Sequence, residues 1–418
     1  GGWLEPTEYT LVMRRLSEKR MLPFLLATGQ VTQEMIEDLA DLLSRFHGQA
    51  DRGARIGAQR YLQVVEQQWS ENIAEIRPFL RRARERDTYA ALQTFGKDFL
   101  AGHAELLMRR AREGWIRDVH GDLHCDHINF AQEGIQIFDC IDFSPRLRRC
   151  DLASEIAFLL MDLQARGGAI WIQPFLKRYQ AAINDKDLLT LLPFGKCYRA
   201  LVRAKVHALR LGRWNDESAG YFRLAGQLTW DSLKPFVVLI CGLTGSGKST
   251  LSRALGERTG LTVINSDVVR KSITGKTGPQ DSPLQRGIYA PAMTELTYAD
   301  MLRQTEKQIE HGSGAIVDAT FGRRAQREKF LRLAEKHHVP LAVIHCAASD
   351  AATEKRLLRR AMEGRDISDG RWPVYVEQKL AHEAVEEISP SSLLMLDTEA
   401  PVDCLATTSE QFLRSRLL

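Results

Sequence analysis

The chain has 418 residues, of which 44% are hydrophobic and 26% are charged, and its formal net charge at pH 7 is +4. This length and composition predict a globular protein with two domains. No run of about 18 apolar residues and no basic-then-apolar leader is present, so neither a membrane span nor export is indicated and we expect a cytoplasmic protein. This small net charge does not indicate that the protein binds nucleic acid, although such binding stays possible.

The seven cysteines are odd in number and scattered, and none of them forms a C-x-x-C pair. This pattern argues against a disulfide framework and against a zinc site. We expect most of these cysteines to be buried small apolar residues.

The N-terminal half is expected to be mostly helical. A short strand at Tyr9–Met13 comes first, and apolar residues then recur at helical spacing from Thr32 to His47 and in similar stretches to about residue 112. A strand follows at Gly134–Asp139, and Asp151 begins a strongly apolar helix that runs to Leu163. Further helix is expected to about Trp230.

From about residue 235 the pattern changes to short apolar strands that alternate with helical segments. The expected strands are Phe236–Cys241, Thr262–Asn265, Ala315–Val317, Leu341–Cys346 and Leu393–Leu396. This alternation is typical of an α/β domain with a parallel sheet, here of about five strands. We therefore predict two domains, residues 1–232 and residues 236–418.

The clearest motif comes directly after the first of these strands. Residues 242–249 read G-L-T-G-S-G-K-S and fit the pattern G-x-x-x-x-G-K-[ST] between a strand and a helix. In such a loop the glycines let backbone N–H groups converge on phosphate oxygens, the lysine reaches the outer phosphates and the serine ligates Mg²⁺. The motif predicts binding of ATP with Mg²⁺; the alternative is a Gly-rich structural turn. The expected phosphate-binding residues are Gly242, Thr244, Gly245, Ser246, Gly247, Lys248, Ser249 and Thr250.

Two acidic residues follow the next strands of the expected sheet. Asp267 comes just after Thr262–Asn265, and Asp318 comes just after Ala315–Val317. In open parallel sheets, ligands bind at the edge where the strands end, so both carboxylates are expected near the phosphate-binding loop. The alternatives are that Asp267 only caps the next helix and that Asp318 is only a turn residue.

Together these residues resemble P-loop kinases of the group that includes polynucleotide 5′-kinases, zeta-toxin-like kinases and gluconate-type kinases. The resemblance covers roughly residues 236 to 418. It rests on the phosphate-binding loop, on Ser266–Arg270, on Asp318–Phe321 followed by Arg324 and Arg327, and on Arg356–Arg360.

This resemblance implies transfer of a phosphoryl group from ATP to a hydroxyl group. Lys248 is then part of the catalytic machinery, Asp267 accepts the hydroxyl proton, and Arg270 holds an anionic part of the acceptor. Asp318 and Ser249 are the expected Mg²⁺ ligands. Arginines of a late segment would close over the transferring phosphoryl group, and the candidates are Arg356, Arg359, Arg360 and Arg365. The alternative is that this segment is one solvated face of a helix.

A second motif lies in the N-terminal half, where residues 119–130 read V-H-G-D-L-H-C-D-H-I-N-F. With Asp139 after the next strand and Asp151 at the start of an apolar helix, it resembles the C-terminal lobe of aminoglycoside-phosphotransferase-like kinases, over roughly residues 5 to 230. The resemblance implies a protein-kinase-like lobe in which Asp122 is the catalytic base and Asp139 binds metal. The strand Tyr9–Met13 would be the hinge between lobes.

The sequence departs from this second family at two places. The second metal ligand should be an asparagine five residues after Asp122, but His127 stands there, and this histidine is expected to be able to bind metal. Only eight residues precede the hinge strand, so the Gly-rich loop and the phosphate-gripping lysine have no room. We expect a fragment without its small lobe; the alternatives are true degeneracy and a polar loop in an inactive helical domain.

The whole sequence thus resembles a bacterial group of two-domain kinases. We expect the P-loop domain to use ATP and Mg²⁺ to phosphorylate a small-molecule or nucleotide-like acceptor, and Arg270 suggests that this acceptor is anionic. Sugars, nucleosides, polynucleotides and small alcohols stay open as acceptors. The alternative functions are a nucleotide-gated ATPase or regulatory binding module and a toxin-like kinase that acts on a nucleotide sugar.

Overall fold

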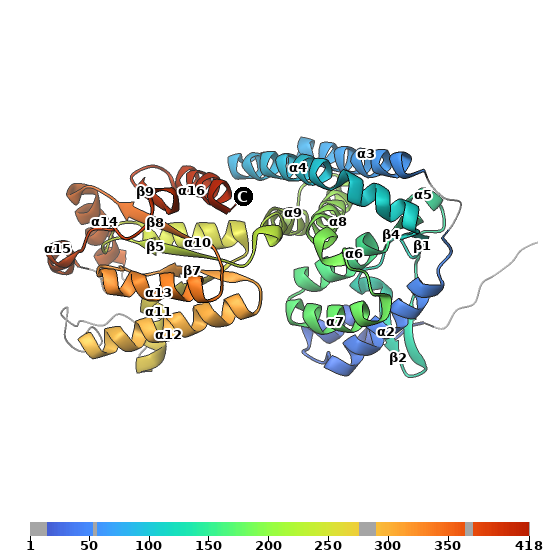
Figure 1. Ribbon diagram of the computed structural model, residues 1–418, viewed down its shortest axis with the longest axis horizontal. Coiled ribbons are helices and arrows are strands. Elements are labelled where there is room, and N and C mark those ends of the chain that lie inside the picture. The colour runs from blue at the N-terminus through green and yellow to red at the C-terminus, as the bar shows by residue number, and fades with distance from the viewer. Residues whose placement is uncertain (1–14, 53–56, 276–289, 364–370, 418) are drawn as a thin grey trace, which may run out of the picture. The chain divides into compact units, whose positions relative to one another are not determined.

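The computed structural model describes residues 15–52, 57–275, 290–363 and 371–417 (Figure 1). By packing, the chain divides into two compact units, one of residues 1–80 and 92–225 and one of residues 81–91 and 226–418. The strand expected at Tyr9–Met13 lies outside the described residues.

The first unit is mainly helical, as the spacing of its apolar residues predicted. The helices described in residues 15–228 are α1 (Leu22–Ala27), α2 (Gln33–Gln49), α3 (Ala58–Ile76), α4 (Ala83–Glu113), α5 (Pro145–Arg148), α6 (Leu152–Ala165), α7 (Ile172–Ile183), α8 (Leu188–Leu211) and α9 (Asp216–Leu228). Helix α6 packs along α8, and α2 packs along α7. Every residue of α6 from Leu152 to Leu163 except Ser154 is buried, which explains why its sequence is apolar on all sides. As predicted, Asp151 starts this helix, and its carboxylate accepts a hydrogen bond from the Ala153 N–H at 2.8 Å.

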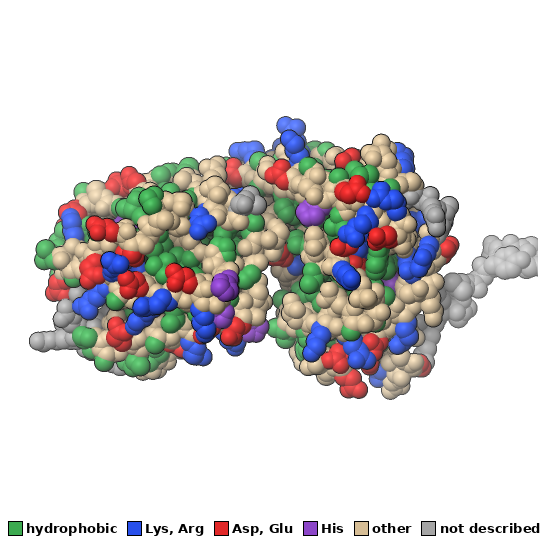
Figure 2. All heavy atoms as spheres, viewed as in Figure 1, with side chains coloured by type: hydrophobic (Ala, Val, Ile, Leu, Met, Phe, Trp, Pro, Cys, Tyr) green, Lys and Arg blue, Asp and Glu red, His purple; other side chains and the backbone are tan. Residues whose placement is uncertain are grey.

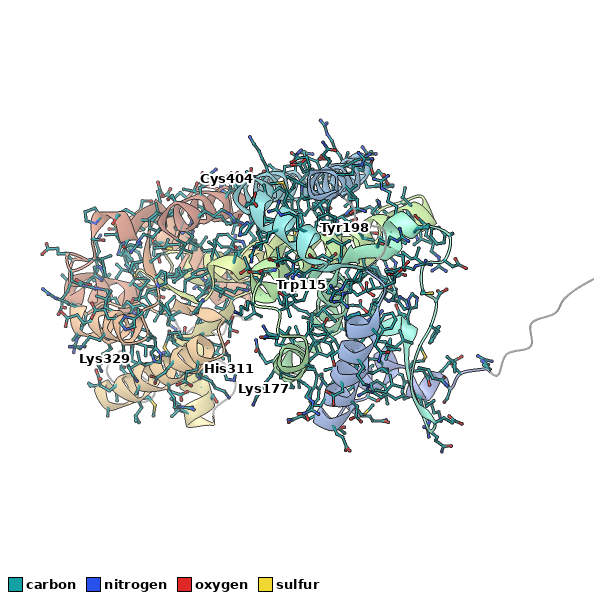
Figure 3. All side chains as sticks on the ribbon, turned by 45° about the vertical axis from the view of Figure 1, so that its right-hand side comes forward. Trp115, Lys177, Tyr198, His311, Lys329 and Cys404 are labelled. Carbon is teal, nitrogen blue, oxygen red and sulfur yellow. The ribbon has the colours of Figure 1, made fainter. Side chains whose placement is uncertain are left out.

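Two short antiparallel ribbons support the H-G-D loop. Strand β1 (Ile116–Asp118) pairs with β4 (Arg149–Asp151), and β2 (Ile128–Ala131) pairs with β3 (Gly134–Ile137). The loop connects β1 to β2, and Asp139 follows β3. The fully buried Arg110 fixes the end of β4, because its guanidinium bonds Asp151 at 2.7 and 2.8 Å. The ring of Trp115, labelled in Figure 3, lies 4.7 Å from the guanidinium carbon of Arg110.

The second unit is an α/β domain with one parallel sheet. Its strands are β5 (Phe236–Cys241), β6 (Thr262–Asn265), β7 (Gly314–Asp318), β8 (Leu341–Ala347) and β9 (Leu393–Asp397). Its helices within the described ranges are α10 (Lys248–Thr259), α11 (Ser266–Thr274), α12 (Pro291–Glu310), α13 (Arg324–Lys336), α14 (Asp350–Glu363), α15 (Trp372–Ala381) and α16 (Val402–Leu417). The sheet order is β6-β7-β5-β8-β9, so β5 is central. The prediction of about five parallel strands is confirmed, to within one residue at each strand end.

Both faces of this sheet are covered, which is why its central strands are apolar throughout. Val237 and Leu239 of β5 belong to a core with side chains of α12 and α13, whereas Val238 and Ile240 belong to a second core with side chains of α10 and α16. This alternation follows from the two-residue period of a strand. The loops that follow the strands lie at the carboxyl edge of the sheet.

The surface carries charges of both signs. On the face drawn in Figure 2, Lys and Arg side chains are interspersed with Asp and Glu side chains, in keeping with the net charge of +4. None of the helices that the structure describes has the length and apolar composition that a membrane span requires.

Candidate functional site

The predicted phosphate-binding loop connects β5 to α10 at the carboxyl edge of the sheet. Gly242, Gly245 and Gly247 have φ angles of 139°, 78° and 88°, in the region that favours glycine. A β-carbon at Gly242 would lie 2.3 Å from the carbonyl oxygen of Cys346, so a larger residue would require a backbone shift. Helix α10 begins at Lys248, and its first N–H groups face the loop. The loop therefore has the backbone form that phosphate binding requires.

Side chains from α14 and the end of β9 hold this loop in place. Arg356 donates to the carbonyl oxygens of Gly245 at 3.3 Å and of Thr398 at 2.6 Å. The Thr398 hydroxyl in turn donates to the carbonyl oxygen of Ser246 at 2.7 Å. Thr398 carries no motif in the sequence, and only its position after a strand could have drawn attention to it.

Asp318 lies beside the start of α10, at the end of β7. It is 1% exposed and accepts hydrogen bonds from the Ser252 hydroxyl at 3.0 Å and from the Asn265 amide nitrogen at 2.7 Å. The same amide nitrogen lies 3.4 Å from the hydroxyl oxygen of Ser249. Asn265 thus bridges the two residues that were predicted to bind Mg²⁺, although the sequence alone gave no role to this asparagine.

Asp267 and Arg270 occupy the first turns of α11 and form an ion pair at 2.7 Å. The capping residue of this helix is Asn265, whose side-chain oxygen accepts from the N–H groups of Asp267 at 3.0 Å and Val268 at 3.1 Å. The alternative that Asp267 serves only as the helix cap is therefore wrong, because another side chain makes the capping bonds.

A cavity of about 490 Å³ connects these groups. Its lining includes Thr244, Gly245, Gly247, Lys248, Ser249, Asn265, Asp267, Arg270, Glu295, Tyr298, Asp318, Arg323, Arg360 and Gln378. Within the loop, the Lys248 ammonium donates to the carbonyl oxygen of Leu243 at 2.8 Å. One cavity is therefore lined by the loop lysine, by the two carboxylates at or just after strand ends, Asp267 and Asp318, and by three arginines.

The four candidate arginines of the late segment fall in different places. Arg360 lines the cavity, whereas Arg356 donates a hydrogen bond to a backbone carbonyl oxygen of the phosphate-binding loop. Arg359 lies on α14 and is not part of the cavity lining. Arg365 lies outside the described residues.

Arg327 supports the fold next to the site. It is fully buried, pairs with Glu387, and donates to the carbonyl oxygens of Phe321 and Ala384, each at 2.8 Å. It therefore braces the segment after β7. Arg324, by contrast, pairs with Glu328 on the exposed side of α13 at 2.7 Å.

In the first unit, two buried side chains hold the H-G-D loop. Glu155 accepts from the N–H groups of His120 at 3.0 Å and Gly121 at 3.1 Å, and Arg199 donates to the carbonyl oxygen of Gly121 at 3.1 Å. Burial raises the pKa of Glu155 to about 7. Gly121 has a φ of 82°, which favours glycine at this position. No motif marks Glu155 or Arg199, and both were missed in the sequence.

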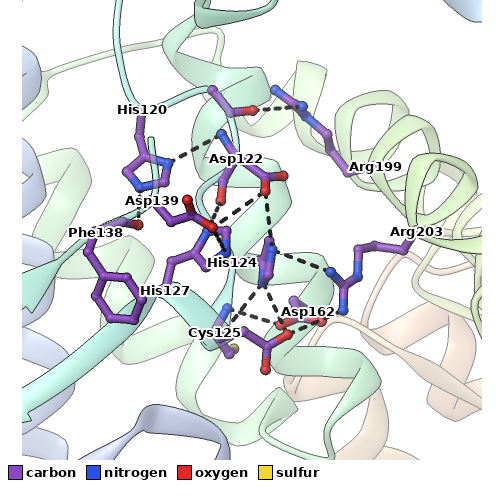
Figure 4. Close-up of polar contacts among 12 residues, drawn as sticks. His120, Asp122, His124, Cys125, His127, Phe138, Asp139, Asp162, Arg199 and Arg203 are labelled. Atoms are coloured by element: carbon purple, nitrogen blue, oxygen red, sulfur yellow. Dashed lines mark hydrogen bonds and ion pairs between the residues drawn. The ribbon is translucent and has the colours of Figure 1, made fainter. Parts of the chain in front are cut away.

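The same loop and the end of β3 bring four side chains together (Figure 4). Asp122 Oδ2 lies 3.4 Å from His124 Nε2 and 3.7 Å from His127 Nδ1, and Asp139 Oδ2 lies 3.4 Å from His127 Nε2. Burial opposes ionisation of Asp122, but the His124 hydrogen bond and nearby positive charges outweigh it and lower the pKa of this carboxyl. The structure therefore clusters the three predicted residues of this half and adds His124.

Two family models match separate parts of the chain. A model described as phosphotransferase enzyme family matches residues 2–191, and one described as AAA domain matches residues 237–383. The uncharacterised proteins Rv2004c of Mycobacterium tuberculosis and Mb2027c of Mycobacterium bovis are each 32% identical to this chain over 379 residues, which cover 88% of this chain and 74% of the relative.

Solved structures of small kinases resemble part of the chain. The APS kinase CysC of Mycobacterium tuberculosis, in complex with AMPPNP and APS, is 16% identical and covers 43% of this chain and 98% of that chain, with a TM-score of 0.33. A gluconokinase from Sinorhizobium meliloti is 17% identical and covers 44% of this chain and 94% of that chain, with a TM-score of 0.31.

Proposed function

Because this chain belongs to the family of Rv2004c, and joins a phosphotransferase-family region to a P-loop kinase domain, we propose that its second unit transfers the γ-phosphoryl group of ATP to a hydroxyl group of an acceptor. The cavity carries this proposal, because it places Lys248 and Ser249 of the loop in one space with Asp267 and Arg270 of α11. A carboxylate beside an arginine, opposite a phosphate-binding loop, suits an acceptor that carries a negative charge.

In the proposed reaction each residue of this cavity has its own role. The N–H groups of the loop and the Lys248 ammonium hold the phosphates of ATP. Asp267 accepts the proton of the acceptor hydroxyl as the new oxygen–phosphorus bond forms and the bond to the β-phosphate oxygen breaks. Arg270 orients an anionic part of the acceptor, and Arg360 neutralises charge on the transferring group.

A magnesium ion, which P-loop kinases require, fits the Ser249 hydroxyl and the Asp318 carboxylate, since both are oxygen donors. When bound, it would supply charge neutralisation at the outer phosphates. Asn265 would keep the Asp318 carboxylate in place through its bond at 2.7 Å.

We also propose that residues 1–232 and 236–418 are separate domains, with Asp122 at the position of the base in a kinase-like C-terminal lobe. The family matches at residues 2–191 and 237–383 support this boundary, since they fall on opposite sides of it.

The test is incubation of the full chain with γ-labelled ATP, Mg²⁺ and a pool of metabolites and oligonucleotides, followed by mass spectrometry. Label on an acceptor supports the kinase, and label on a nucleotide sugar supports the toxin-like variant. Release of free phosphate alone would favour the nucleotide-gated module, and no consumption of ATP would contradict the proposal.

A further inference from the structure

The cluster around the H-G-D loop has a donor set that differs from the one its family implies. In that family, an asparagine and an aspartate hold Mg²⁺, an ion that prefers oxygen ligands. Here the imidazoles of His124 and His127 stand beside the carboxylates of Asp122 and Asp139. Two imidazoles fit Mg²⁺ poorly, whereas they suit Zn²⁺ and neighbouring transition ions.

The distances between the donors are close to those of ligands that share one ion. One donor atom each from Asp122, His124 and His127 lies within 4.8 Å of the other two, and the distance from Asp122 Oδ2 to His124 Nε2 is 3.4 Å. In a tetrahedral zinc site with bonds of about 2.0–2.1 Å, neighbouring ligand atoms are about 3.3–3.4 Å apart. Two pairs of donor atoms are already at this spacing, Asp122 Oδ2 with His124 Nε2 and Asp139 Oδ2 with His127 Nε2.

His127 is already oriented for coordination. Its Nδ1 lies 2.9 Å from the carbonyl oxygen of Asp122, so this nitrogen carries the proton and donates it. In the neutral ring the lone pair is then on Nε2, which lies 3.4 Å from Asp139 Oδ2. Metal-binding histidines commonly donate their second N–H to a backbone carbonyl in this way.

The neighbouring carboxylates, Asp126 and Asp162, form ion pairs with arginines. Arg166 pairs with Asp126 at 2.7 Å and with Asp162 at 2.9 Å, and Arg203 pairs with Asp126 at 3.3 Å. These acids are therefore poor candidates for ligands. Arg203 also lies 3.3 Å from His124 Nε2, and it must turn away from that atom when an ion binds, while its bond to Asp126 can remain.

We propose that Asp122, His124 and His127, with Asp139 as a further donor, form a site for a first-row transition ion that prefers Zn²⁺ over Mg²⁺. The ion would connect the H-G-D loop to the segment after β3. It would also occupy the carboxylate that the family uses as a base.

The test uses the nucleotide-free 418-residue chain, titrated with Zn²⁺ alone by calorimetry and with Co²⁺ alone by visible absorption. A single ion should bind the cluster tightly, and a roughly thousandfold excess of Mg²⁺ should leave it bound. His127→Asn and His124→Asn should each weaken Zn²⁺ binding at least about tenfold. His127→Asn restores the residue that the family carries, so it should also narrow the preference for Zn²⁺ over Mg²⁺.

His311→Asn is the matched control, because it removes an exposed imidazole just after α12 (Figure 3) and should leave Zn²⁺ binding unchanged. Circular dichroism monitors the fold of each variant. If a histidine variant fails to fold, Asp139→Asn, which changes an exposed side chain, tests instead whether the cluster binds Zn²⁺. The proposal is overturned if the wild-type chain binds no Zn²⁺, if His127→Asn binds it as tightly as His311→Asn does, or if Mg²⁺ at equal concentration displaces Co²⁺.

Discussion

Lys248 is expected to matter far more for chemistry than for folding. Its one described side-chain hydrogen bond is to Leu243 within the loop, at 2.8 Å. Lys248→Ala should therefore leave the circular dichroism spectrum unchanged while ATP turnover falls by much more than tenfold. A tenfold loss corresponds to only about 1.4 kcal/mol of transition-state stabilisation. Lys336→Ala is the control, since this lysine pairs with Glu306 and neither residue lines the cavity; turnover within tenfold of wild type in Lys248→Ala would contradict the assignment.

Asp267 is expected to act on the acceptor and not on ATP. Asp267→Asn keeps the shape of the side chain but cannot accept the hydroxyl proton, so phosphoryl transfer should be lost. Binding of ATP, measured by calorimetry, should stay within about threefold of wild type. A collapse of ATP affinity would make Asp267 a ligand of the nucleotide or its metal, and the base would have to be another residue.

The turn between β6 and α11 depends on Asn265, which caps the helix and also holds Asp318. Asn265→Ala should cost about 1 kcal/mol of the free energy of unfolding, through loss of the cap, and it should also lower turnover. Asn265→Asp is the informative comparison, because it can cap the helix yet places a second carboxylate against Asp318. Equal turnover in wild type and Asn265→Asp would show that the contact with Asp318 is not needed.

The segment after α15 is tied to α13 by the buried pair of Arg327 and Glu387. Removal of one partner leaves a buried charge, so Arg327→Met should lower the free energy of unfolding by about 3–5 kcal/mol in urea titrations. The double variant Arg327→Met with Glu387→Leu should recover part of this loss, because both charges are then gone. A single variant as stable as wild type would show that the pair contributes little.

The two units of the chain are expected to differ in their contribution to the measured activity. Phosphoryl transfer by positioned charges needs a full set of phosphate-binding groups, and a base by itself accelerates little. Asp122→Ala should therefore leave transfer within about twofold of wild type, whereas Lys248→Ala should abolish it. The comparison of the two variants under identical conditions checks this, and a large loss in Asp122→Ala would place part of the chemistry in the first unit.

The sequence by itself determined the class of each unit. The strands of the second unit were predicted to within one residue at each end, because short apolar runs that alternate with helical segments indicate the strands of a parallel sheet. The phosphate-binding loop was equally clear, since its glycines and lysine are adjacent in the chain and their chemistry is local. The helical first unit followed from periodicity in the same way.

Only the tertiary structure decided which distant side chains meet. The bridge from Ser249 through Asn265 to Asp318 exists because the sheet order places β7 between β6 and β5, and periodicity does not encode strand order. The role of Arg356 as a brace also depends on its distant partner Thr398. His124 joined the cluster for the same reason, since a short helical turn at Cys125–His127 folds its ring against that of His127. Such contacts depend on the packing of whole elements, which a linear pattern of residue types does not specify.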